Sequence, residues 1–139
     1  LIQKDILNTS FGVYRFGSSG SRWGRNGRKF KLVGGKAAMW FDILDGIQNT
    51  ITLDSLKIKV TYQDTGYATW GVYGYSQRCQ KEYRVGQVQN TNTGSFLTQT
   101  FIASKFKWGN RMLNQSDFAI KLLAGENFAI TIVEVERLN

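Results

Sequence analysis

The sequence predicts an all-β protein, a jelly-roll β-sandwich of two antiparallel sheets with about eight or nine strands. Apolar and polar residues alternate with a period of two in short runs, which is the pattern of half-buried strands. Turn residues separate these runs, and no run has the period of a helix. The chain has 15 glycines and no proline among its 139 residues, which suits uninterrupted strands and loops with positive φ. We therefore expect residues 1–139 to form one β-sandwich domain.

Three strands are expected before residue 50, at Phe11–Phe16, Lys29–Val33 and Ala38–Ile43. Glycine-rich segments separate them, as turns require. In the third strand, Trp40 stands at a spacing that is more typical of a core residue than of a ligand platform.

The clearest strand is Leu56–Tyr62 (LKIKVTY), whose apolar residues alternate strictly with two lysines and a threonine. The next expected strand, Tyr67–Tyr75, follows a turn at Asp64–Gly66. On the alternating faces of these two strands, Tyr62 and Trp70 point inward, so both are predicted to lie in the core.

Four more strands are expected in the second half, at Glu82–Val88, Phe96–Phe101, Phe118–Leu123 and Phe128–Val135. The last is apolar on both faces at its start, as a central strand of a sandwich would be. Its alternation predicts Ile130 and Ile132 on the same face.

Composition argues against catalysis. The chain has no histidine and one cysteine, Cys79, so catalytic triads, Cys–His pairs and His–zinc sites are excluded, and Cys79 is expected to be an ordinary half-buried thiol. The ten acids form no recognisable acid–base pair. Asp64 and Asp117 are expected to accept hydrogen bonds in turns. We expect no enzyme activity and no cofactor, with a structural calcium at Asp64 as the open alternative.

Positive charge is concentrated near the start of the chain. Between Ile6 and Phe41 there are seven cations and no carboxylate, and the net charge of the whole chain is +8. In this stretch Trp23 lies in a loop of small residues that would leave its indole free to stack on a sugar ring. The polar side chains around it would supply hydrogen bonds and anion contacts: Arg22, Arg25, Asn26 and Arg28. The alternative is that Trp23 covers one edge of the sandwich.

Two further groups of residues are candidate ligand-binding surfaces. In the first, Trp108 lies at a turn between Lys107 and Arg111. The second group is weaker and comprises Tyr67, Tyr73, Tyr75 and Arg78. Its alternation indicates that some of these tyrosines face solvent, without identifying which.

Several segments of the middle and end of the chain follow a known pattern: Leu56–Trp70 (LKIKVTYQDTGYATW), Phe96–Phe101, Ala103–Phe106, Asn110–Arg111, Asp117–Ile120 and Ile132–Val135. Together they resemble the galactose-binding-like jelly-roll modules that are appended to bacterial polysaccharide-degrading enzymes. The resemblance covers roughly residues 36–138. Phe96 stands where these modules have a tryptophan, and Ser76–Gln87 matches nothing in the pattern, so no ligand-site residue carries over there.

The resemblance implies a non-catalytic carbohydrate-binding module. The charge favours an anionic ligand, a sulfated or uronic-acid polysaccharide of the algal type, held by aromatic stacking and by arginine and lysine. The alternatives are a single-stranded nucleic-acid-binding β domain, which also interleaves cations with aromatics, and a structural or receptor-binding domain of a phage or capsid.

The biological context is also an expectation. The chain begins at Leu1 rather than at Met, so we expect a mature or excised piece, secreted or at the bacterial cell surface. We expect it to be appended to a larger carbohydrate-active enzyme, with a polysaccharide rather than a membrane or a nucleic acid as its partner.

Overall fold

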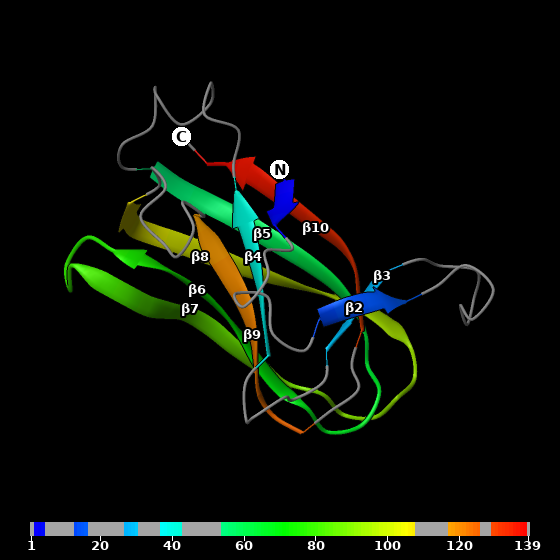
Figure 1. Cartoon of the computed structure of the whole chain (residues 1–139). Coiled ribbons are helices and arrows are strands. Elements are labelled where there is room, and N and C mark those ends of the chain that lie inside the picture. The colour runs from blue at the N-terminus through cyan, green and yellow to red at the C-terminus, as the bar shows by residue number, and fades with distance from the viewer. Residues whose placement is uncertain are drawn as a thin grey trace.

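The computed structural model describes residues 2–4, 13–16, 27–30, 37–42, 54–107, 117–125 and 129–138. Every regular element in these ranges is a β-strand (Figure 1). The strands are β1 (Ile2–Lys4), β2 (Val13–Phe16), β3 (Gly27–Phe30), β4 (Ala37–Asp42), β5 (Asp54–Gln63), β6 (Thr69–Ser76), β7 (Lys81–Gln89), β8 (Phe96–Lys107), β9 (Phe118–Ala124) and β10 (Ala129–Arg137). The predicted all-β class is confirmed, and β1 is a strand that the sequence pattern did not predict. No helix in the described ranges has the length and hydropathy to cross a membrane.

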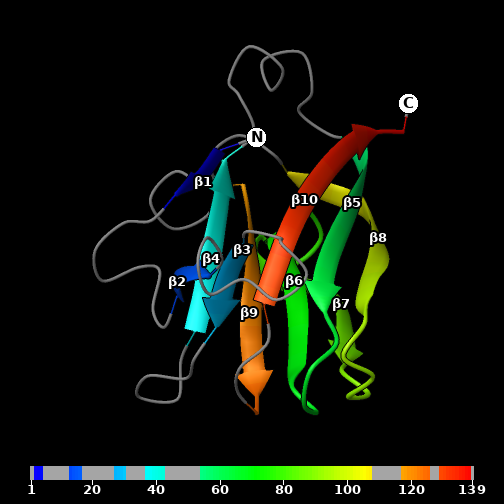
Figure 2. The same cartoon turned by 90° about the vertical axis from the view of Figure 1, so that its right-hand side faces the viewer.

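The strand order is that of a jelly roll. One layer has the order β3-β10-β5-β8 and the other β4-β9-β6-β7, and all of these pairings are antiparallel. Counted from β3, the first layer holds the first, eighth, third and sixth strands, and the second layer holds the second, seventh, fourth and fifth. This interleaving is the product of two Greek keys. β2 extends the first layer beside β3, and β1 extends the second beside β4; Figure 2 shows β10, β5 and β8 side by side.

The two layers are joined by β8, so the hydrogen-bonded ladder is continuous. Along most of its length β8 pairs with β5, but its last two residues pair with β6, where Lys107 lies opposite Tyr75. The change of partner follows a β-bulge, in which Ser104 and Lys105 together face one residue of β5. Lys105 has a φ of 61° in this bulge. The expected pair of sheets is therefore one sheet folded over on itself at this corner.

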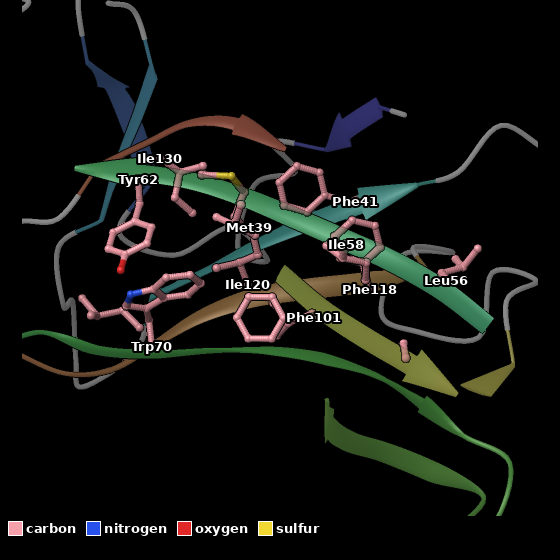
Figure 3. Packing of buried hydrophobic residues seen from close by; sticks show 14 of the residues in the cluster. Met39, Phe41, Leu56, Ile58, Tyr62, Trp70, Phe101, Phe118, Ile120 and Ile130 are labelled. Atoms are coloured by element: carbon pink, nitrogen blue, oxygen red, sulfur yellow. The ribbon is translucent and has the colours of Figure 1, made fainter. Parts of the chain in front are cut away.

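The core fills the space between the layers (Figure 3). Trp70 is 0% exposed and makes edge contacts with Tyr62 and Phe101 across the core, at centroid distances of 5.0 and 5.7 Å. Phe41 and Phe118 stack at 4.9 Å. Tyr62 and Trp70 thus lie inward, as their alternation predicted. Trp40 is also buried, but on the other face of its layer.

A second bulge corrects the expected faces of β10. Ile130 is 3% exposed and joins the core, whereas Ile132 is 47% exposed. The pairing of β10 with β5 shifts between these two residues, and the extra residue, Thr131, reverses the alternation. Val133 and Val135 then take the core-facing positions. The prediction that Ile130 and Ile132 share a face was wrong.

A polar network ties together two turns at one end of the sandwich. Asp64 is fully buried, and its carboxylate accepts hydrogen bonds from the backbone N–H and the hydroxyl of both Thr91 and Thr93, at 2.6–3.1 Å. Next to it, Asn90 accepts a 2.9 Å hydrogen bond from Nε1 of Trp70 and donates to the carbonyl of Thr65. Burial would raise the pKa of Asp64, but these hydrogen bonds lower it to about 2.

The turn role predicted for Asp64 is therefore confirmed, since both of its oxygens accept from donors of the loop. Among the described residues, no group of three or more His, Cys, Asp or Glu side chains is placed to hold a metal ion, and the calcium alternative at Asp64 stays a prediction. Asp117 is likewise fully buried in the turn before β9, where its N–H donates to the carbonyl of Phe41.

Candidate functional site

Aromatic side chains gather on the face of the β4-β9-β6-β7 layer that is turned away from the core, which we call the outer face. In β6, Trp70 and Val72 point into the core, so the alternation turns Tyr73 and Tyr75 outward. The pairing places Tyr73 between Ala119 of β9 and Arg84 of β7. Because the two tyrosines are two residues apart, their Cα atoms lie about 6.6 Å apart along one strand.

A small buried cluster lies against these rings. Ala38, Trp40 and Ala119 form a buried cluster, and Tyr73 and Tyr75 pack against it while staying half-buried. Gly71 is needed in the same row, because a Cβ there would lie 2.7 Å from the carbonyl oxygen of Gly86 and 3.4 Å from the Tyr73 ring. The two tyrosine rings therefore pack against this cluster on one side and are partly exposed to solvent.

Lys121 fixes the charge at the centre of the outer face. Its Nζ lies 5.2 Å from the centroid of Trp40 and 5.0 Å from that of Tyr73, within the range of cation–π attraction. The same ammonium forms an ion pair with Glu82 of β7. The lysine is held by two rings and a carboxylate, so Tyr73 is held in turn.

A second polar pair lies on β7 beside the tyrosines. Nη1 of Arg84 donates a 2.6 Å hydrogen bond to Oε1 of Gln87. The pairing sets Arg84 opposite Tyr73 and Gln87 opposite Gly71, and both β7 side chains are exposed. The outer face thus offers two aromatic rings flanked by donors and acceptors from Lys121, Glu82, Arg84 and Gln87.

The predicted site residues divide into four sets. Arg78 and Lys107 come together, because Arg78 lies in the turn after β6 and Nζ of Lys107 lies 3.5 Å from Oε1 of Gln80 in that turn. Tyr67 is 66% exposed but precedes β6, a strand of eight residues that spans about 26 Å, so it lies at the opposite end of the layer. Arg28 belongs to β3, where only its backbone is described. Six predicted residues fall outside the described ranges: Arg22, Trp23, Arg25, Asn26, Trp108 and Arg111.

The polar half of the outer face was not predicted from the sequence. The alternation in Lys81–Gln89 puts Glu82 and Arg84 on one face, which is a usable signal. It does not show that Lys121, 39 positions beyond Glu82, would lie against it. Cys79 was expected to be half-buried, but it lies exposed in the turn after β6, since no apolar neighbour in that turn covers it.

No protein-family model and no curated protein sequence matches this chain. Among solved structures, a family 29 carbohydrate binding module variant is similar over 91% of this chain and 82% of its own, with 9% identity and a TM-score of 0.44. Another variant of such a module, complexed with cellulohexaose, has a TM-score of 0.43 with 9% identity over 91% of this chain and 81% of its own.

The enzymatically active domain of tailspike protein 4 of bacteriophage CBA120 is similar over 91% of this chain but 18% of its own, with 9% identity and a TM-score of 0.48. Carbohydrate-binding modules, the class that the sequence resembles, thus recur among the solved structures similar to this chain. All of these likenesses are distant, and the jelly-roll assignment follows from the strand pairings themselves.

Proposed function

We propose that this chain is a non-catalytic carbohydrate-binding module that holds a polysaccharide on the outer face. The observation that supports this proposal is the placement of Tyr73 and Tyr75 on one face, packed against the cluster of Ala38, Trp40 and Ala119 and flanked by two pairs of polar side chains. A sugar ring presents a C–H face that packs on an aromatic ring, and its hydroxyl groups both donate and accept hydrogen bonds. The outer face supplies both kinds of contact.

The polar pairs combine donors with acceptors, which the hydroxyl groups of a sugar require. Lys121 is a donor and Glu82 an acceptor, so together they complement two adjacent hydroxyls. Arg84 and Gln87 supply a second set of donors and acceptors at the edge of the layer. These groups already contact each other, so little side-chain freedom is lost when they bind a ligand.

The charge supports an anionic polymer as the ligand. The chain carries a net charge of +8, and a neutral glycan does not require such an excess. Sulfate esters or uronic acids would pair with arginine and lysine. In this proposal the module works in a secreted or cell-surface protein, attached to a larger carbohydrate-active enzyme that it keeps close to the polymer.

Catalysis is not part of the proposal. The chain has no histidine. Among the described side chains, Glu82 pairs with Lys121, Glu136 pairs with Lys57 at 3.4 Å, and Asp64 accepts from its loop. Each of these carboxylates has a cationic or hydroxyl partner, and none is paired with a second carboxylate as acid–base catalysis by two acids would require.

Affinity electrophoresis through gels with sulfated, uronic or neutral polysaccharide tests the proposal. We expect retention by at least one anionic polymer and about tenfold weaker retention for Tyr73→Ala. Tyr83→Ala is the matched control. Tyr83 is an exposed tyrosine of β7, with 53% of its surface accessible, and it lies opposite Gly74, whose position faces the core rather than the outer face. Equal retention of Tyr73→Ala and the wild-type chain would contradict the proposal. Displacement by single-stranded DNA but not by free oligosaccharide would favour the nucleic-acid alternative instead.

A further inference from the structure

Four cations gather at the corner where β8 changes layers, and we call them the basic corner. They come from two segments that are distant in sequence, the turn after β6 and the end of β8. Arg78, Lys81 and Lys105 are exposed, and Lys107 is half-buried. The sequence pattern had linked two of these residues, Arg78 and Lys107, only to separate surfaces.

Hydrogen bonds fix the two segments against each other. The N–H of Gln77 donates to the carbonyl of Lys105 at 3.0 Å, and the N–H of Gln80 donates to the carbonyl of Ser76 at 2.9 Å. The Gln80 side chain then donates to the carbonyl of Gln77 at 2.6 Å and accepts from Nζ of Lys107 at 3.5 Å. The positions of the cationic residues are thus set by backbone contacts as well as by side chains.

One cationic residue of the corner, Lys105, has an unfavourable backbone conformation. Lys105 has a φ of 61°, a left-handed conformation that is unfavourable for an L-residue and that glycine adopts freely. Glycine would form the bulge more easily, yet the position carries a charged side chain. Strain of this kind is found where a site fixes a functional side chain.

No acid whose side chain the structure describes forms an ion pair with this corner. Asp54 of β5 lies opposite Phe106, and only its backbone is described. Glu82 is the nearest in sequence, and it pairs with Lys121 on the outer face. Asp117 is fully buried. Glu136 pairs with Lys57 on the opposite layer, and Glu134 lies opposite Lys59 there. Among the side chains that the structure describes, the basic corner therefore has an excess of positive charge at the surface.

We propose that the basic corner is an anion-binding subsite that takes the oxyanion groups of an acidic polysaccharide. It adjoins the outer face, because Lys107 lies directly opposite Tyr75, and side chains of such a pair are about 5 Å apart at Cβ. A polymer that stacks on the tyrosines would reach the corner with a neighbouring sugar. The inference rests on the proposed function for the sugar contacts, but the corner binds the charged groups by its own chemistry. Sulfate esters and carboxylates share this chemistry.

The test compares dextran sulfate, carboxymethyl dextran and neutral dextran, which share one backbone. The corner variant combines Arg78→Gln, Lys81→Gln, Lys105→Gly and Lys107→Gln, and Lys105→Gly alone removes one charge while relieving the backbone. We expect binding to one or both charged dextrans, weakened about tenfold in the corner variant. The slope of log affinity against log salt should fall by about one for each contact removed.

The control variant Lys57→Gln/Lys59→Gln removes charge from the opposite layer. We expect it, and Tyr83→Ala, to bind the charged dextrans nearly as the wild-type chain does. Equal weakening by the control and by a corner double variant, Lys105→Gly/Lys107→Gln, would overturn the proposal, because the effect would then follow net charge. Binding to neither charged dextran would overturn it as well.

Cys79 provides a second readout, because it is the only cysteine of the chain and lies exposed between Arg78 and Lys81. An environment-sensitive fluorophore on this thiol should respond to the charged dextran at low salt and stay unchanged with neutral dextran. No response at a saturating concentration would overturn the corner assignment. If Tyr73→Ala binds dextran sulfate normally while the corner variant does not, the subsite is supported and the proposed role of the outer face is contradicted.

Discussion

Protonation of the Asp64 carboxylate should lower the free energy of unfolding of this domain. The carboxylate accepts four hydrogen bonds from Thr91 and Thr93, and its pKa is about 2 rather than the ordinary 3.8. A group whose pKa is lowered by folding stabilises the folded state above its unfolded pKa. This contribution is therefore complete above about pH 5 and is lost as the pH falls through about 4 toward 2.

The magnitude follows from the size of the shift. Each pKa unit corresponds to about 1.4 kcal/mol, so a fall from 3.8 to about 2 sets an upper bound of roughly 2.5 kcal/mol. The loop that surrounds the carboxylate is exposed, and solvent screening reduces the expected value to about 1–2 kcal/mol. Asp64→Asn should cost about 2–3 kcal/mol at pH 7, because an amide accepts with one oxygen and leaves donors of the loop unpaired.

Urea unfolding followed by tryptophan fluorescence at several pH values between 2 and 7 would measure this effect. The difference in unfolding free energy between the wild-type chain and Asp64→Asn should shrink by about 1–2 kcal/mol as the pH falls from 5 to 2. Glu136→Gln, at an exposed ion pair, is the control, and its difference should change by a few tenths of that amount at most. A constant difference for Asp64→Asn across this range would refute the reasoning.

Three further substitutions test the core and the outer face. Trp70→Ala should cost about 3–5 kcal/mol in urea unfolding, because the indole is fully buried and its N–H bonds to Asn90; near-wild-type stability would show that the core assignment is wrong. Gly86→Ala should cost about 1–3 kcal/mol, since a Cβ there would lie 2.7 Å from Cδ1 of Phe101, and an unchanged melting temperature would contradict that contact. Lys121→Met should keep most of the stability, because the apolar methionine side chain replaces one ion pair and two ring contacts. It should weaken polysaccharide retention severalfold. Retention at the wild-type level would exclude Lys121 from the site.

The local alternation of the chain predicted those strands that are regular. In Leu56–Tyr62 every second residue is buried, as expected. The faces of β10 were mispredicted, because a bulge is one extra residue and nothing in the run Ala129–Arg137 marks where it falls. The sequence also did not predict that β8 extends from Phe96 to Lys107. Phe96–Phe101 has the length and pattern of a complete strand, so nothing in it indicates that the strand continues.

The site was harder to predict than the fold, because it depends on which strands are neighbours. The sequence grouped Tyr73 and Tyr75 with Tyr67 and Arg78 and predicted that some of these tyrosines face solvent, without identifying which. Lys121 comes from β9, which pairs with β6 only in the folded chain, so its contact with Tyr73 has no local signal. The cations near Trp23 were conspicuous in the sequence, but Arg22 and Arg25 lie outside the described residues.

The passage of β8 from one layer to the other affects how the molecule opens. Its backbone hydrogen bonds hold β5 along most of the strand and β6 at its end, so neither layer can peel away from the other without breaking this strand. Amide protons of β8 near Phe106 should therefore exchange with solvent only when the whole domain unfolds. Their exchange rate should equal that of the core amides of β5 and of β6. Because β8 is hydrogen-bonded to both layers, we expect the two layers to unfold together as one cooperative unit.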